Sequence, residues 1–138
     1  MAKRVLDVGN CVPDHAAIRR LLESTFHADV VQVDDSVSAL AALRQEPFDL
    51  VLVNRKLDID YSDGLDIIQQ IKADPKLAAV PCMLITNYPD QQQIAVAAGA
   101  VTGFGKKELH TDQTKSRLAQ FLDPGDTSSP SPSGRASG

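Results

Sequence analysis

The segment FDLVLVN, at residues 48–54, decides the fold of this chain. Its centre is a continuous apolar run without the apolar-polar alternation of a half-exposed strand. Such a run is typical of a strand that is buried on both faces of a parallel sheet. Short apolar runs recur along the chain, and we predict strands at residues 4–8, 29–33, 49–53, 82–86 and 101–104.

Stretches with helical periodicity separate these runs. Ile18, Leu21 and Leu22, for example, share one face of a helix. From N-cap and C-cap residue types we expect helix starts near Asp14, Asp35, Ser62 or Asp63, and Thr111, and a helix end at Gly99. Five strands that alternate with five helices imply right-handed crossovers and an α/β doubly wound parallel sheet. In such sheets the functional crevice lies beyond the carboxyl ends of the strands.

Composition divides the 138 residues into a domain and a tail. Residues 1–122 carry the strand and helix pattern, whereas residues 123–138 are rich in Pro, Ser and Gly and predict a disordered tail or linker. The net charge of −4, without a basic run, argues against nucleic acid as a partner. No apolar run is long enough for a signal peptide or a membrane span, and Cys11 and Cys82 lack metal-ligand spacing. We therefore expect a cytoplasmic protein with free thiols and no membrane contact.

Three segments give the chain a family resemblance. FDLVLVN, VPCMLITN at residues 80–87 and AAGAVTGFGKK at residues 97–107 occur in the order and at the positions typical of a CheY-like receiver domain. The chain thus resembles the receiver domain of bacterial two-component response regulators from residue 3 to residue 122. The resemblance implies a flavodoxin-like (βα)5 fold with strand order 2-1-3-4-5 and a role in phosphorelay signal transduction.

The resemblance also implies a phosphorylation pocket, and here the sequence departs from the family. In the family an acidic pair and a phosphoacceptor aspartate bind Mg²⁺, and the aspartate takes a phosphoryl group from a histidine kinase. The acidic pair falls on Gly9 and Asn10 of this chain, and the phosphoacceptor falls on Asn54. An Asn amide is no nucleophile for this transfer, and Mg²⁺ prefers carboxylate oxygens. We therefore expect no cofactor, no metal, no phosphorylation of Asn54 and no enzymatic activity.

Other pocket positions match the family. The hydroxyl position falls on Thr86, the lysine on Lys107 and the switch aromatic on Phe104. The proline that usually follows the lysine is replaced by Glu108, so the peptide bond there could be cis or trans. We expect a degenerate, phosphorylation-independent receiver, a pseudo-receiver. It would contact a histidine kinase, another receiver or an effector through the face of helix four, strand five and helix five, and a homodimer is left open.

The sequence leaves alternatives open for the partner of Asp7, for the phosphoacceptor and for the role of Lys107. Asp7 interrupts the first strand, and it could pair with Lys107 across Gly9 or lie at a solvated strand edge. The phosphoacceptor could have moved to Asp58, Asp60 or Asp7, although aspartates in loops more often cap backbone N–H groups. Lys107 and Thr86 could instead bind an anion or a small ligand.

Four further side chains could belong to a site or to the surface. His15, His27 and His110 lack ligand spacing and are expected at the surface. Cys11 could be a reactive thiol at the pocket rim or an inert loop residue.

Overall fold

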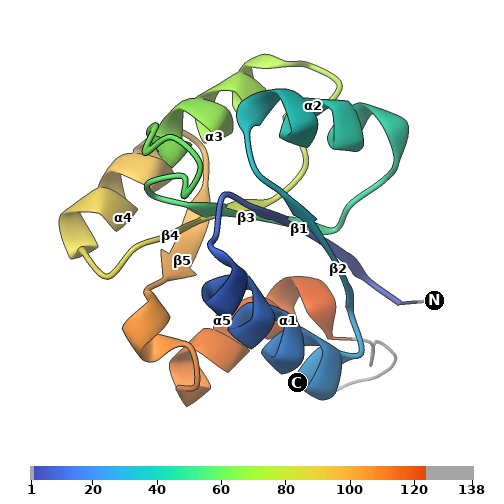
Figure 1. Cartoon of the computed structure of the whole chain (residues 1–138), viewed down its shortest axis with the longest axis vertical. Helices are drawn as coiled ribbons and strands as arrows, with labels where there is room; N and C mark the ends of the chain where they lie inside the picture. Colours follow the sequence, from blue (N-terminus) through green and yellow to red (C-terminus); the bar gives the residue numbers. More distant parts are fainter. Residues whose placement is uncertain (1, 124–138) are drawn as a thin grey trace.

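The computed structural model describes residues 2–123, and the predicted alternation of strands and helices is present throughout this range (Figure 1). The elements are β1 Arg4–Val8, α1 Val12–Phe26, β2 Asp29–Val33, α2 Ser36–Gln45, β3 Leu50–Asn54, α3 Gly64–Ala73, β4 Cys82–Ile85, α4 Pro89–Ala97, β5 Val101–Phe104, the short 3-10 helix η1 Lys106–Glu108, and α5 Asp112–Leu122. The tail predicted from residue 123 lies, except for Asp123, outside the described residues.

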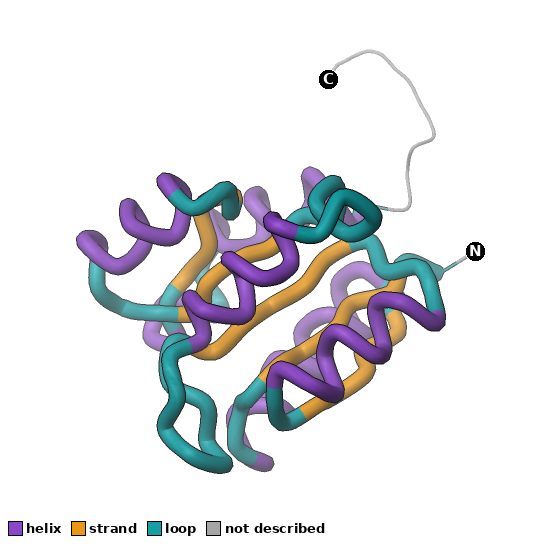
Figure 2. Tube along the Cα trace, turned by 90° about the horizontal axis from the view of Figure 1, so that it is seen from above, coloured by secondary structure: helices purple, strands orange, loops and turns teal. Residues whose placement is uncertain are grey.

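The five strands form one parallel sheet in the order β2-β1-β3-β4-β5, as expected. Helices α2, α3 and α4 cover one face, and α1 and α5 cover the other (Figure 1). Seen from above, one helical layer lies in front of the strands and the other behind them (Figure 2). The chain adds β2 on one side of β1 and then adds β3, β4 and β5 on the other side. The strand order therefore reverses between β1 and β3, and the crevice lies at the carboxyl ends of these two strands.

Burial on both faces explains the continuous apolar runs. The residues of β3 from Leu50 to Val53 are fully buried, and alternate side chains enter the two helical layers. Each such side chain stabilises the fold by roughly 1.5–3 kcal/mol relative to exposure. In β1 the alternation sends Leu6 and Val8 towards α2 and α3, and sends Val5 and Asp7 towards α1. Asp7 is therefore a carboxylate in a buried layer.

Helix caps agree with the sequence at most positions. The side chains of Asp35, Asp63 and Thr111 accept bonds from backbone N–H groups in the first turns of α2, α3 and α5, at 2.8, 3.0 and 3.2 Å. The expected start of α1 at Asp14 is wrong, because the helix begins at Val12 with Cys11 as its N-cap. Its first turn contains a proline, which lacks the N–H that an N-terminal turn leaves unpaired.

The peptide bonds and the helix lengths bear on two predictions from the sequence. All peptide bonds of the described residues are trans, including Lys107–Glu108. No helix among residues 2–123 is long and apolar enough to cross a membrane.

Candidate functional site

The polar residues that follow four strands gather at the carboxyl edge of the sheet. Gly9 and Asn10 follow β1, Asn54 ends β3, Thr86 follows β4, and the turn to η1 follows β5. The side chain of Asn54 donates to the carbonyl oxygen of Gly9 at 3.3 Å and so joins the ends of β1 and β3. This edge therefore brings together Gly9, Asn10, Asn54 and Thr86, four of the residues that the sequence singled out.

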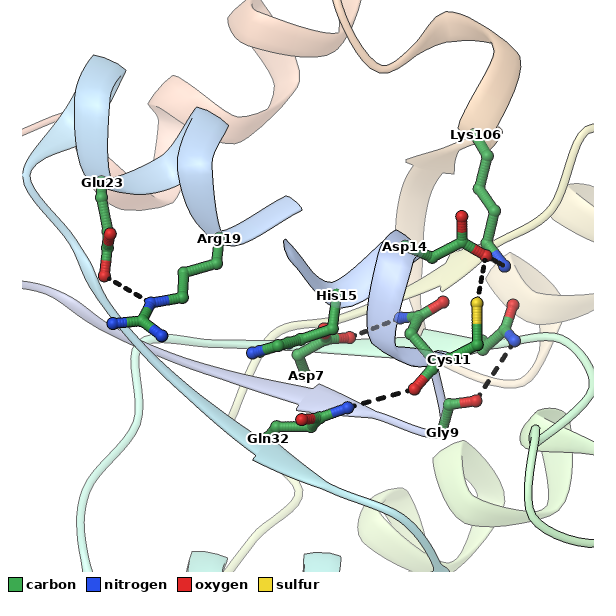
Figure 3. A network of polar contacts seen from close by, with 11 residues as sticks. Asp7, Gly9, Cys11, Asp14, His15, Arg19, Glu23, Gln32 and Lys106 are labelled. Atoms are coloured by element: carbon green, nitrogen blue, oxygen red, sulfur yellow. Dashed lines mark hydrogen bonds and ion pairs between the residues drawn. The ribbon is translucent and has the colours of Figure 1, made fainter. Parts of the chain in front are cut away.

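Asp7 forms a buried polar cluster with His15 and Asn10. Its carboxylate has no exposed surface, and its Oδ2 lies 2.7 Å from Nδ1 of His15, on the first turns of α1 (Figure 3). Its Oδ1 accepts from the side-chain amide of Asn10. Burial raises the pKa of Asp7 above its usual value, although the bonds from His15 and Asn10 act against this rise.

This cluster corrects two expectations. The partner of Asp7 is His15 and not Lys107, because the alternation of β1 points the carboxylate into the layer beneath α1. His15 is accordingly not a surface residue, since only 14% of its side chain is exposed. The displaced phosphoacceptor considered at Asp7 also loses support, because a carboxylate without exposed surface is out of reach of a phosphodonor.

The backbone between β1 and α1 leaves no room for an acidic side chain at position 9. Gly9 has a φ of +80°, where residues with a side chain are strained. A Cβ there would collide with the side chain of Leu57, which is fully buried. Asn10 is also buried, and its Oδ1 has no hydrogen-bond partner among the described residues. The side chain of Gln32 holds the carbonyl of Asn10 at 3.1 Å.

Beside this cluster, Asp14 connects the start of α1 to η1. Its Oδ2 lies 2.7 Å from Nζ of Lys106 and 3.2 Å from Sγ of Cys11 (Figure 3). The bond from Lys106 lowers the pKa of Asp14, so this carboxylate stays ionised at neutral pH. Lys106 is thus the lysine that reaches into the pocket region.

A cavity of about 230 Å³ opens beside Asn54. Its lining contains three cationic side chains and no carboxylate: Asn54, Arg55, Lys56, Ile85, Thr86, Asn87, Tyr88 and Lys106. The guanidinium of Arg55 lies over the ring of Tyr88, 5.6 Å from its centroid. The amide of Asn54 is turned towards backbone oxygens and donates to the carbonyl of Lys56 at 2.7 Å.

A second, larger cavity of about 460 Å³ lies on the face made by α4, β5 and α5. Thr86, Phe104 and Lys107 are among its lining residues. Lys107 therefore does meet Thr86 at a cavity, but the lysine in the lining beside Asn54 is Lys106. The side chain of Asn87 accepts from the backbone N–H of Lys107 at 3.1 Å and fills the space where Gly105 lacks a Cβ. This packing fixes which of the two lysines enters each cavity.

Gln92 and Arg117 tie the same face to the sheet. The side chain of Gln92 donates to the carbonyls of Leu84 and Thr86, at 2.9 and 3.3 Å, and accepts from the N–H of Gly103 at 2.9 Å. Arg117 donates to the carbonyl of Gly103 at 2.8 Å. Phe104 is almost fully buried, so the residue expected as the switch aromatic points inward.

The aspartates of the β3–α3 loop do not gather around a point. Asp60 accepts from the N–H of Ser62 at 2.9 Å, and Asp63 caps α3. Asp58 is exposed, and its backbone N–H donates to the carbonyl of Gly9 at 2.8 Å. Within residues 2–123 no three His, Cys, Asp or Glu side chains are placed to hold a metal ion.

Sequence reasoning missed His15, Lys106 and the pair Arg55 and Lys56 as site residues. One signal was available for His15, because Asp7 stands alone in an apolar strand and requires a buried partner. Arg55 and Lys56 directly follow Asn54, so their position near the crevice could also have been inferred. The choice between Lys106 and Lys107 depends on how Asn87 packs against the turn after β5, which the sequence does not reveal.

Comparisons with known proteins agree with this architecture. Residues 10–119 match the family described as response regulator receiver domain. The chain is similar to the chemotaxis protein CheY-3 of Vibrio cholerae, with 26% identity over 117 residues, which covers 81% of this chain and 88% of that protein.

Two solved structures have the same fold. A putative response regulator from Chloroflexus aurantiacus superposes with a TM-score of 0.74 at 16% identity, over 88% of this chain and 98% of that one. The receiver domain of the sensor histidine kinase PA1611 from Pseudomonas aeruginosa, with magnesium in its active site cleft, gives 0.72 at 19% identity over the same shares. The chain therefore belongs to the family of response regulator receiver domains, the CheY-like signalling modules of two-component systems.

Proposed function

We propose that this chain is a pseudo-receiver, which signals by contact with other proteins and without phosphorylation of its own pocket. Receiver domains interact with histidine kinases, other receivers or effectors. The observation that carries the proposal is the lining of the cavity beside Asn54, which holds three cations and no carboxylate.

The chemistry of phosphoryl transfer supports this proposal. Transfer to a carboxylate forms an acyl phosphate and needs an ionised oxygen together with a metal ion that spreads the charge. The amide of Asn54 supplies no such oxygen, and its nitrogen is engaged with the carbonyls of Gly9 and Lys56. Three cations would also repel Mg²⁺. The cavity therefore lacks both the acceptor and the metal ligands of the reaction.

The packing around Gly9 supports it further. In the family this position carries one of the two metal-binding carboxylates. Here Leu57 occupies the space of the missing side chain, so a single substitution at Gly9 would not restore the acidic pair. The pocket has thus been repacked with apolar atoms and also lacks the acidic side chains of the family.

The interaction surface is the face of α4, β5 and α5. Tyr88, Ile94 and Val96 are large apolar residues with more than two fifths of their surface exposed, and the 460 Å³ cavity lies on this face. Exposed aromatic and aliphatic residues beside a hollow are typical of protein contact sites. Without a phosphoryl group, a partner that prefers one conformation must set the equilibrium between conformations.

The test of the phosphorylation claim is chemical. The full chain is incubated with acetyl phosphate and Mg²⁺, and its intact mass is compared with that of a receiver that retains the acidic residues. We expect the phosphoryl adduct only in the receiver that retains the acidic residues. A stable adduct on this chain would refute the proposal, and peptide mapping would then show whether Asp58 or Asp60 has become the acceptor.

The test of the interaction claim uses the two tyrosines. Tyr88→Ala removes a ring that is 59% exposed from the proposed face, and Tyr61→Ala removes a ring that is 76% exposed from the β3–α3 loop. We expect Tyr88→Ala alone to weaken capture of the receiver's partner from extracts of cells that express the chain, or self-association if the partner is a second copy. Equal losses in both variants, or a loss only with Tyr61→Ala, would refute the use of this face.

A further inference from the structure

We propose that the cavity beside Asn54 is a reversible binding site for a small doubly charged oxyanion, with inorganic phosphate as the simplest occupant. The proposal concerns non-covalent binding by Arg55, Lys56 and Lys106, and it depends on the proposed function only in that Asn54 stays unmodified. It places the anion beside Lys106, not in the Lys107 cavity.

Charge is the first argument for this site. The lining holds three cations and no carboxylate, and of these cations Lys106 is paired, with Asp14. Arg55 and Lys56 form no ion pair with any carboxylate among the described residues. Two positive charges are therefore left uncompensated at one cavity, which matches a doubly charged anion.

Unused hydrogen-bond donors are the second argument. The hydroxyl oxygen of Thr86 accepts from the N–H of Tyr88 at 3.2 Å, and its proton is donated to no acceptor within residues 2–123. The amide nitrogen of Asn87 is likewise unused in this part of the chain, because only its oxygen is engaged, with Lys107. Thr86 is buried, so its hydroxyl has little access to bulk water. A tetrahedral oxyanion accepts such bonds from several directions at once.

Size and wall structure are the third argument. The volume of about 230 Å³ is below the range of roughly 300–1,000 Å³ that drug-sized ligands occupy, and it suits a small ion with some of its water. Ile85 supplies an apolar wall, which strengthens electrostatic interactions inside the cavity. The guanidinium of Arg55 packs over the ring of Tyr88, and both residues line the cavity. Arg55 can therefore form paired bonds to an oxyanion with little loss of freedom.

Titration of the full chain with sodium phosphate tests the proposal. Amide chemical shifts are recorded by NMR, against sodium chloride of matched ionic strength. We expect saturable phosphate-specific shifts at residues 55, 56, 86 and 106, which return to their starting values after dialysis. Shifts that match those of chloride, or that do not saturate, would overturn the site.

Charge-neutral variants locate the anion. Lys56→Gln and Arg55→Gln should each weaken phosphate binding about 5–10-fold, because each removes a charge-assisted bond. Lys107→Gln removes the same charge from the neighbour of Lys106, outside the cavity lining, and should weaken binding less than about twofold. Equal effects in all three variants would show general charge attraction and overturn the proposal.

A parallel incubation with acetyl phosphate and Mg²⁺ separates this proposal from the proposed function. Lys56 is exposed and has no side-chain partner among the described residues, so its variant should keep the fold. A phosphoryl group that acetyl phosphate transfers to the chain, and that persists through dialysis and raises the intact mass, would refute the pseudo-receiver. Reversible binding without a mass change supports both proposals, and no binding without a mass change refutes only the anion site.

Discussion

Replacement of His15 by alanine should destabilise the protein in a way that depends on pH. The substitution removes the Nδ1 partner of Asp7, a carboxylate without exposed surface, and leaves Asn10 as its remaining side-chain partner. A hydrogen bond to a charged group contributes about 1.5–3 kcal/mol. Alanine recovers up to about 0.7 kcal/mol through its better helix propensity in α1. We therefore expect a net loss of about 1–2 kcal/mol in the free energy of unfolding at neutral pH.

The sign of the pH dependence follows from the pKa of Asp7. Burial already raises this pKa, and removal of His15 takes away a contact that lowers it, so the pKa of the variant rises further. A carboxyl group whose pKa is raised by folding favours the folded state at low pH, and this contribution is lost as pH rises through the folded-state pKa. The variant should therefore lie closest to the wild type in acid and furthest from it at neutral pH.

The assay is urea unfolding followed by circular dichroism at several pH values between acid and neutral. His110→Ala is the matched control, because His110 is exposed, and its effect should stay within about 0.5 kcal/mol at every pH. In Asp7→Asn, the further change His15→Ala should cost less than it does in the wild type, since the buried carboxylate that His15 contacts is gone. A loss for His15→Ala that is independent of pH, or equal in the Asp7→Asn background, would refute the reasoning.

Two further predictions concern the α4 face and the cysteines. Gln92→Ala should lower the free energy of unfolding by about 2 kcal/mol, because it leaves the N–H of Gly103 without its acceptor. The control Gln93→Ala changes an exposed neighbour and should have little effect. Equal losses of the two variants in urea unfolding would contradict this prediction. Burial raises the pKa of Cys82 to about 11, so iodoacetamide at pH 8 should modify only Cys11 in the native protein and both thiols in urea, as peptide mass spectrometry would show. Rapid native modification of Cys82 would mean that β4 opens locally.

The fold could be predicted from the sequence because its signals are local or periodic. Continuous apolar runs such as the one in β3 indicate a doubly covered parallel strand, and the family resemblance implied the strand order. The caps at Asp35 and Thr111 were predictable for the same reason, since a cap acts within three residues. The start of α1 was predicted wrongly because Asp14 has a stronger capping tendency than Cys11. The backbone path after β1 instead places Cys11 at the N-cap.

The sequence by itself determined that the pocket positions Gly9, Asn10 and Asn54 carry no carboxylate, because that fact depends only on residue identity and strand order. Only the tertiary structure decided where the remaining charges go. The pairing of Asp7 with His15 depends on which face of β1 meets α1, and the choice of Lys106 depends on how Asn87 packs against the turn after β5. Side-chain partners across elements are set by packing in three dimensions, and a one-residue shift in a strand or turn exchanges them.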